Sequence, residues 1–209
     1  MEIVHKKIEE YIQALYPTKD PVLKEMEALA VRKDFPIVGS MAGRLLYQLA
    51  RMTHANSIFE MGSGFGYSTY WFAMALPHSG FIYHTDTSAV NSKLAQEFLR
   101  KGRQMNKVRF LVGNALELID TTREMFDIVF IDIEKDSYPA AYEKAKKKVK
   151  PGGLLVADNT LWWGRVLDKK GDAATEGIKK FNQLVASDKD FFQTILPVRD
   201  GISVNFKLK

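Results

Sequence analysis

The sequence contains no cysteine, which excludes disulfide bonds and thiolate metal sites. Its histidines are few and scattered, so no pair has the spacing of a zinc site. Long hydrophobic runs are also missing. The most apolar stretch, residues 70–76, is far too short to span a bilayer, and residues 1–15 lack the apolar core of a signal peptide. We therefore expect a cytoplasmic protein that does not engage a membrane.

The bulk composition is that of an ordinary globular protein. The chain has 209 residues, of which 46% are hydrophobic and 26% charged. It shows no internal repeat, low-complexity tract or linker, so we predict one domain over residues 1–209. The net charge of +5 is a weak preference for anionic partners and does not by itself indicate nucleic-acid binding.

Helical spacing dominates the first quarter of the chain. Apolar residues recur at helical intervals in residues 1–54, and Pro17, Pro21 and Pro36 divide this region into separate pieces. We predict an N-terminal helical cap over residues 1–54.

Short β-rich runs alternate with helical patterns beyond residue 54. Alternation of this kind predicts βαβ units and a mainly parallel sheet with helices on both faces. The run from Ile128 to Ile131 is apolar throughout, as expected for a strand covered on both faces. Asp200-Gly201 is a turn signal for an antiparallel hairpin near the C-terminus. The predicted strands are residues 57–61, 81–85, 108–112, 126–131, 154–157, 191–196 and 202–206.

Polar residues stand at the ends of successive predicted strands. In an open α/β sheet, ligands bind beyond the carboxyl ends of the strands, so these positions are candidate site residues. Four of the five are acidic, which is hard to explain as chance surface composition. They are Glu60, Asp86, Asn114, Asp132 and Asp158.

A glycine-rich turn follows the first predicted strand, with the order Gly62-Ser63-Gly64-Phe65-Gly66. Glycines allow a tight turn and close approach to a ligand. The spacing differs from the G-x-G-x-x-G of nicotinamide-dependent dehydrogenases. Glu60, just before the turn, would repel a pyrophosphate but suits the ammonium group of an amino-acid-like cofactor. A loop without a ligand remains the alternative.

Asp86 and Asn114 each allow two interpretations. The Asp86 carboxylate can accept hydrogen bonds from both hydroxyls of a ribose, or it can cap the following helix. Asn114-Ala115 stands where an adenine ring could be held, or forms a simple turn.

Asp132, Asp158 and Asn159 follow two neighbouring strands and can present three oxygen ligands to one hard cation. Mg²⁺ is the first choice, with Mn²⁺ and Ca²⁺ as alternatives. Such a cation lowers the pKa of a bound hydroxyl. Lys135 is then placed to take the proton; the alternative is a solvated lysine in a charged loop.

Two further features allow both a functional and a plain interpretation. Trp162 and Trp163 either form the wall of a substrate pocket or pack a loop. A group of lysines is predicted to form the solvent-exposed face of a helix that ends at residues 151–153. The functional alternative is a patch that binds nucleic acid. These lysines are Lys144, Lys146, Lys147, Lys148 and Lys150.

Residues 58–207 resemble the cation-dependent O-methyltransferases, which include caffeoyl-CoA and catechol O-methyltransferases. Three motifs in the right order carry the resemblance: residues 130–135 (FIDIEK), 158–162 (DNTLW) and 196–201 (LPVRDG). In this chain Ile133-Glu134 stands where the family usually has Ala-Asp. Residues 11–15 and 35–38 look more like a bacterial branch of the family.

The resemblance implies a Rossmann-like, seven-stranded methyltransferase sheet whose last strand is antiparallel. It also implies metal ligation by Asp132, Asp158 and Asn159, Lys135 as the base, and a homodimer. S-adenosylmethionine (SAM) is the implied cofactor. With the glycine-rich turn and Asn114 added, the expected cofactor-binding residues are Val38, Glu60, Gly62, Ser63, Ser68, Asp86, Asn114, Ala115 and Asp132.

We therefore predict a metal-dependent O-methyltransferase acting on a catechol-like or vicinally oxygenated small molecule. Methylation of 5-hydroxyuridine at the tRNA wobble position is the alternative within the same chemistry. A nicotinamide-dependent dehydrogenase and a cofactor-binding protein without catalysis are alternatives from other classes. The glycine spacing argues against the first, and the second would need neither Lys135 nor Asp158-Asn159.

Overall fold

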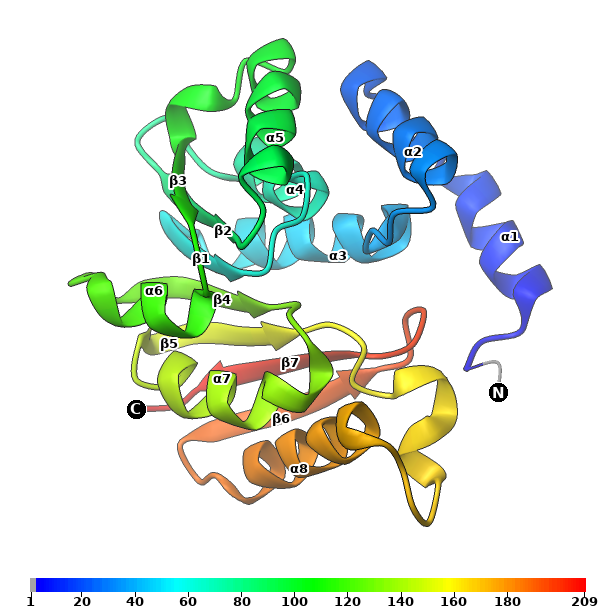
Figure 1. Cartoon of the computed structure of the whole chain (residues 1–209), viewed down its shortest axis with the longest axis vertical. Helices are drawn as coiled ribbons and strands as arrows, with labels where there is room; N and C mark the ends of the chain where they lie inside the picture. Colours follow the sequence, from blue (N-terminus) through cyan, green and yellow to red (C-terminus); the bar gives the residue numbers. More distant parts are fainter. Residues whose placement is uncertain (1–2) are drawn as a thin grey trace.

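The computed structural model describes residues 3–209 and is built around one seven-stranded sheet (Figure 1). The strand order is β3-β2-β1-β4-β5-β7-β6. The first five strands pair in parallel, whereas β7 runs antiparallel to both β5 and β6. The predicted fold class is therefore confirmed. The strands are β1 (Ser57–Met61), β2 (Phe81–Asp86), β3 (Val108–Val112), β4 (Phe126–Ile131), β5 (Val149–Ala157), β6 (Phe191–Leu196) and β7 (Ile202–Lys207).

Helices cover both faces of the sheet, with α4 and α5 on one side and α7 and α8 on the other (Figure 1). Three short 3-10 segments, η1 (Met105–Lys107), η2 (Lys135–Ser137) and η3 (Trp162–Leu167), lie between the longer elements. The helices are α1 (Lys6–Leu15), α2 (Pro21–Lys33), α3 (Gly39–Met52), α4 (Tyr67–Ala75), α5 (Ala89–Lys101), α6 (Ala115–Thr121), α7 (Tyr138–Ala145) and α8 (Ala173–Ser187).

Alternate residues of each central strand pack into two separate hydrophobic cores, one on each face of the sheet. Successive side chains of a strand point to opposite faces, so Ile128 packs with the helices α2 to α5, whereas Val129 packs with α6 to α8. Both side chains are fully buried. Because both faces of the sheet are covered, the sequences of the central strands contain continuous apolar runs.

The N-terminal region is helical, as its spacing predicts, and forms the three helices α1, α2 and α3. Asp20 caps α2 by accepting hydrogen bonds from the backbone of Val22 and Leu23, with Pro21 in the first turn. Helix α2 then buries Leu23 and Met26. By contrast, within the described part of the chain α1 buries none of its side chains.

The prediction for the lysine-rich segment was wrong in its boundaries. Helix α7 ends at Ala145, and β5 already begins at Val149, so Pro151-Gly152-Gly153 lies inside the strand. A Cβ on Gly153 would stand 2.7 Å from the backbone oxygen of Asp127. The glycine therefore permits a close approach of two strands, and does not end a helix.

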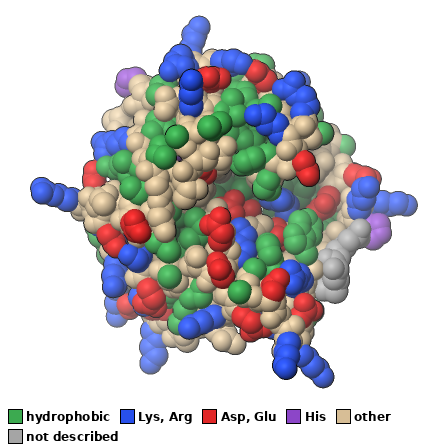
Figure 2. All heavy atoms as spheres, in the orientation of Figure 1, with side chains coloured by type: hydrophobic (Ala, Val, Ile, Leu, Met, Phe, Trp, Pro, Cys, Tyr) green, Lys and Arg blue, Asp and Glu red, His purple; other side chains and the backbone are tan. Residues whose placement is uncertain are grey.

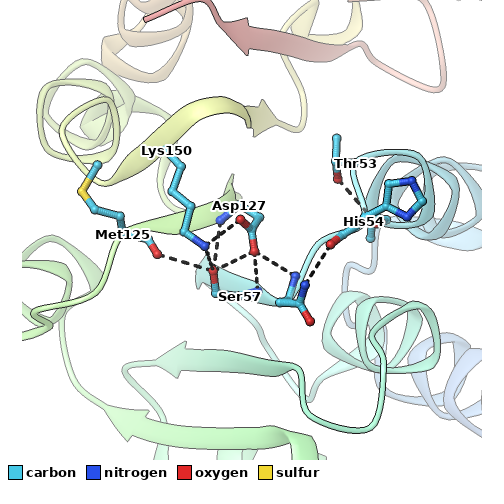
Figure 3. A network of polar contacts seen from close by, with 8 residues as sticks. Thr53, His54, Ser57, Met125, Asp127 and Lys150 are labelled. Carbon is cyan, nitrogen blue, oxygen red and sulfur yellow. Dashed lines mark hydrogen bonds and ion pairs between the residues drawn. The ribbon is translucent and has the colours of Figure 1, made fainter.

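Asp127 joins three strands at their amino ends, the side of the sheet opposite the ligand-binding edge (Figure 3). Its Oδ2 accepts hydrogen bonds from the backbone nitrogens of Asn56 and Ser57, both at 2.8 Å, and its Oδ1 accepts one from Lys150 at 2.7 Å. Burial opposes ionisation, but these donors outweigh it and lower the pKa of Asp127 below its usual value. The network is structural and lies away from the site described next.

Candidate active site

A cavity of about 1010 Å³ opens at the carboxyl ends of the parallel strands. Figure 2 shows this face of the molecule hollowed near its middle, with acidic side chains around the depression. The topology predicts this position, because parallel strands end at one edge of the sheet. The predicted site residues that line the cavity are Val38, Gly62, Ser63, Ser68, Asp86, Asn114, Ala115, Asp132, Lys135, Asp158 and Asn159.

The glycine-rich turn between β1 and α4 lies against the end of β4. Gly62 has a φ of 82°, and a Cβ there would stand 2.1 Å from the backbone oxygen of Asp132. Only glycine fits so close an approach in this conformation. The turn therefore holds the backbone of Gly62 and Ser63 at the cavity wall beside Asp132.

Glu60 does not line the cavity, although it was expected to bind the cofactor. It is fully buried behind the turn, where its Oε2 accepts hydrogen bonds from the hydroxyls of Ser63 and Thr69. Its Oε1 finds no hydrogen-bond partner among the described residues. Burial raises the pKa of Glu60 to about 7, against the opposing hydrogen bonds. The structure thus shows Glu60 supporting the turn, and its contact with the cofactor stays a prediction.

Asp86 holds the turn as well as the start of α5. Its Oδ2 accepts a hydrogen bond from the backbone of Gly64 at 2.9 Å, and its Oδ1 accepts one from Ser88 at 2.8 Å. Ser88 itself is the N-cap of α5, and Asn114 is the N-cap of α6. Helix α5 is therefore capped by Ser88 and not by Asp86, while Asn114, for which a simple turn was the alternative, caps α6. Both Asp86 and Asn114 line the cavity, and their contacts with a cofactor stay predictions.

The buried carboxylate of Asp158 stands at the centre of the candidate metal site. Its Oδ2 faces Arg199 at 3.4 Å, whereas its Oδ1 has no hydrogen-bond partner within residues 3–209. Burial raises the pKa of Asp158 to about 7, the charge of Asp132 adds to this, and Arg199 opposes it. An unpartnered buried carboxylate oxygen beside a second carboxylate is a place where a cation is favourable.

Asn159 supplies the third oxygen of the predicted ligand set, and Asp200 fixes its side chain. The Asn159 amide nitrogen donates to both carboxylate oxygens of Asp200, at 3.0 and 2.9 Å. Asp200 is fully buried, and its backbone oxygen accepts hydrogen bonds from Leu161 and Trp162. From the sequence, Asp200 was predicted only as a turn residue within a motif. An acid in a hairpin turn usually faces solvent, so no local pattern predicted its burial against Asn159.

The set of two carboxylates and one amide suits a hard cation but is not a dense acidic cluster. Across the described chain, no group of three or more His, Cys, Asp or Glu side chains is placed to hold a metal ion. Asn159 completes the set with a neutral oxygen, which Mg²⁺ and Ca²⁺ accept readily. The donor set therefore fits the expected metal.

Lys135 lies inside the cavity, and the alternative of a solvated lysine is wrong. Its side chain is 13% exposed, and its Nζ donates to Asp132 Oδ1 at 2.8 Å and to the backbone oxygen of Ile133 at 2.9 Å. The ring of Tyr138 lies 5.2 Å from the same nitrogen. These contacts hold the amine beside the proposed metal ligands.

Trp162 and Trp163 line the cavity in an irregular segment, where both have positive φ values, of 47° and 53°. Both tryptophans therefore form part of the cavity wall, and their contact with a substrate stays a prediction. Arg199 lines the cavity too, and the sequence analysis gave it no role beyond its place in a motif.

The lysine-rich segment does not form a free basic patch. Lys144 pairs with Asp120, and Lys150 pairs with Asp127. The amine of Lys148 donates to the backbone oxygen of Thr122. The acids paired with Lys144 and Lys150 lower the net positive charge of this surface, which argues against a nucleic-acid patch.

A family model described as O-methyltransferase matches residues 13–208. The chain belongs to this O-methyltransferase family. It is 30% identical to caffeoyl-CoA O-methyltransferase 1 of Eucalyptus globulus, an alignment that covers 91% of this chain and 83% of the relative. It is 28% identical to the catechol O-methyltransferase of Niastella koreensis, with 92% and 90% of the two chains covered.

Solved structures agree with this assignment. The O-methyltransferase from Bacillus cereus, in complex with SAH, superposes with a TM-score of 0.88 at 27% identity, covering 96% of this chain and 97% of that one. The chain is thus a SAM-dependent O-methyltransferase with the fold of its family. The dehydrogenase and the non-catalytic cofactor-binding protein are both wrong. No helix in residues 3–209 has the length and apolar character needed to cross a membrane.

Proposed function

We propose that this O-methyltransferase requires a divalent cation and methylates a hydroxyl of a catechol-like or otherwise vicinally oxygenated small molecule. One observation carries the proposal: the unpartnered Oδ1 of buried Asp158, a residue that lines the same cavity as Asp132 and Asn159. A buried carboxylate oxygen without a partner is costly, and a cation bound there removes that cost.

Asp132, Asp158 and Asn159 would hold the metal, with Mg²⁺ as the first choice. When bound, such an ion stabilises the deprotonated form of a hydroxyl and accepts a second oxygen from the same acceptor. The second oxygen is the reason for expecting vicinal hydroxyls. The names of two relatives, catechol O-methyltransferase and caffeoyl-CoA O-methyltransferase, support this acceptor class.

Lys135 would take the proton of the acceptor hydroxyl. A general base must lie within hydrogen-bond reach of the proton it removes, and the Lys135 amine is 2.8 Å from one proposed metal ligand, Asp132. As a base the amine must be neutral, with two N–H donors that match its two oxygen acceptors and a lone pair left to take the proton. The amine is therefore fixed and close to where the hydroxyl would lie.

The cofactor would occupy the half of the cavity that is lined by the glycine-rich turn and the ends of β2 and β3. Asp86 offers its carboxylate toward the ribose hydroxyls. Aromatic walls at Trp162 and Trp163 would exclude water from the reacting atoms, which strengthens interactions between charges. The residues proposed to bind the cofactor are Val38, Gly62, Ser63, Ser68, Asp86, Asn114, Ala115 and Asp132, which line the cavity, and Glu60, which is buried behind the turn.

Methyl transfer from labelled SAM tests the proposal. Purified protein is incubated with a panel of catechols, with or without EDTA, and in parallel with tRNA that carries 5-hydroxyuridine. We expect label on a catechol that EDTA abolishes and Mg²⁺ restores. Asp158→Asn should lose the Mg²⁺-dependent activity. Asp127→Asn, at the amino ends of the strands, should keep both the activity and its sensitivity to EDTA. Label that is insensitive to EDTA, or label on tRNA alone, would overturn the proposal.

A homodimer belongs to the proposal as well, from the family resemblance. Helix α1 carries large exposed apolar side chains, among them Ile8, Tyr11 and Leu15, at 52%, 62% and 52% exposure. Light scattering on the purified chain measures the assembly directly. A monomer at micromolar concentration would contradict this part of the proposal.

A further inference from the structure

We propose that Arg199 recognises a negatively charged substituent, a carboxylate, on the methyl acceptor. This inference rests on the proposed function and narrows its substrate class from catechol-like small molecules in general to those that carry a carboxylate. The observations behind it are the position of Arg199 in the cavity, its few hydrogen bonds and its backbone conformation.

Arg199 stands at the acceptor end of the cavity. It lies in the loop between β6 and β7, and its guanidinium reaches the Oδ2 of Asp158 at 3.4 Å. The stem of the side chain lies over Gly39, at the start of α3, where an added Cβ would be 3.7 Å from the Arg199 Cδ. The guanidinium is thereby held between the sheet end and the N-terminal helices, next to the proposed metal ligands.

Most of the donor capacity of Arg199 is unused. A guanidinium carries five N–H donors in a planar fork that matches a carboxylate in two parallel hydrogen bonds. Within the described chain Arg199 makes one hydrogen bond, the long contact to Asp158, and its side chain stays 25% exposed in the cavity wall. A carboxylate on a bound acceptor would find a fork with free donors there.

Among the described residues, the other cationic side chain that lines this cavity is Lys135, and it already has hydrogen-bond acceptors. Lys135 donates to Asp132 and to the backbone of Ile133, at 2.8 and 2.9 Å. Arg199 is therefore the cation that remains available to an anionic substituent. The acidic side chains around it would repel such a group elsewhere in the cavity, which makes its position selective.

The backbone indicates that the side chain is needed. Arg199 has a φ of 53°, in the left-handed region, which is unfavourable for a residue with a Cβ. Glycine would adopt this conformation without the penalty, as Gly201 does two residues later with a φ of 99°. Strain of this kind collects at functional positions.

Two acceptors that differ by one carboxylate group test the inference: catechol, and protocatechuate, which is catechol bearing a carboxylate. We expect the wild-type protein to favour protocatechuate in kcat/KM by tenfold or more. In Arg199→Gln this preference ratio should fall at least tenfold, whatever happens to the absolute rates. Arg199→Gly should lose the preference in the same way. Because glycine adopts the positive φ at this position without strain, a loss in this variant cannot be attributed to misfolding. Arg51→Gln removes an exposed arginine whose guanidinium contacts the backbone of Ala75 and should leave the ratio unchanged.

Binding provides a readout that does not depend on turnover. Veratrate and veratrole are the dimethyl ethers of the two acceptors and carry no free hydroxyl. Their affinity in the presence of SAH can be followed by tryptophan fluorescence, because Trp162 and Trp163 line the cavity. We expect tighter binding of veratrate, lost in both Arg199 variants. Equal binding of the two ethers, or an equal fall in kcat/KM for both acceptors, would overturn the inference. Absence of methyl transfer to any acceptor, with veratrate still selected, would instead contradict the proposed function.

Discussion

Both carboxylate oxygens of Asp200 accept hydrogen bonds from the side-chain amide nitrogen of Asn159. An ionised carboxylate only accepts hydrogen bonds, so the nitrogen of the amide must face it. The amide oxygen of Asn159 therefore points away from Asp200, and Asn159 lines the cavity. Asp200 thus orients the neutral oxygen of the proposed metal site without belonging to the ligand set.

Asp200→Asn should weaken metal binding, because it replaces one acceptor oxygen by a donor and frees the Asn159 amide to rotate. Partners that orient metal ligands commonly contribute about 10- to 100-fold in affinity. Mn²⁺ binding followed by electron paramagnetic resonance measures the effect. SAM affinity should change little. Unchanged Mn²⁺ affinity would contradict the orienting role.

Asp127→Asn is the matched control for that measurement. It removes a carboxylate that also accepts hydrogen bonds from a neighbouring segment, but at the amino ends of the strands (Figure 3). It should lower the free energy of unfolding by a few kcal/mol, as loss of a buried hydrogen-bond network does. Its Mn²⁺ affinity should match that of the wild type.

Lys135→Ala should reduce kcat by about 10²- to 10⁴-fold, the usual contribution of a positioned general base. Lys135→Arg separates the base from the positive charge, because arginine keeps the charge beside Asp132 but cannot be deprotonated in a protein. Single-turnover methyl transfer at saturating cofactor measures both variants. If the arginine variant kept most of the activity, Lys135 would serve only as a charge.

The fold was predictable because its central strands are buried on both faces and separated by helical patterns. The start of β5 was not, because Pro151, Gly152 and Gly153 are ordinary turn signals. The strand passes through them where Phe126 pairs with Val149 and the register between β4 and β5 then shifts. That pairing is a tertiary contact, and no local pattern encodes it.

The candidate site was predictable where it follows from topology. Acids at the ends of parallel strands must meet at one edge, which brought Asp132 and Asp158 together in the sequence analysis. Arg199 and Asp200 come from the antiparallel hairpin, whose loop returns to the end of β5. A turn motif predicts the loop but not what the loop approaches, so their contacts with Asp158 and Asn159 required the structure.

Asp86→Ala should weaken SAH binding by about tenfold or more, because hydrogen bonds to a charged acceptor contribute roughly 1.5–3 kcal/mol. The same change frees the backbone nitrogen of Gly64 in the glycine-rich turn. Isothermal titration calorimetry measures the affinity. Asp120→Ala, which removes an exposed acid paired with Lys144, is the control and should bind SAH normally. Wild-type affinity in Asp86→Ala would exclude the ribose contact.

Glu60 should make stability depend on pH. Burial raises its pKa from 4.5 to about 7, so between these values the folded protein holds a proton that the unfolded chain releases. The contribution of Glu60 to the free energy of unfolding should then fall as pH rises from 4.5 to about 7, and level off above. The full difference is at most ~3 kcal/mol, from a shift of roughly two and a half pKa units.

Glu60→Gln tests this dependence, because glutamine stays neutral and keeps nearly the same shape. Urea unfolding of both proteins at about pH 5 and about pH 8 isolates the contribution of this one group. The variant should be more stable than the wild type at the higher pH, by up to ~3 kcal/mol more than at the lower pH. Saturating SAM should reduce the gap if the cofactor's ammonium group stabilises the Glu60 carboxylate. Parallel pH dependences in the two proteins would mean that the carboxylate is ionised and hydrated despite its burial.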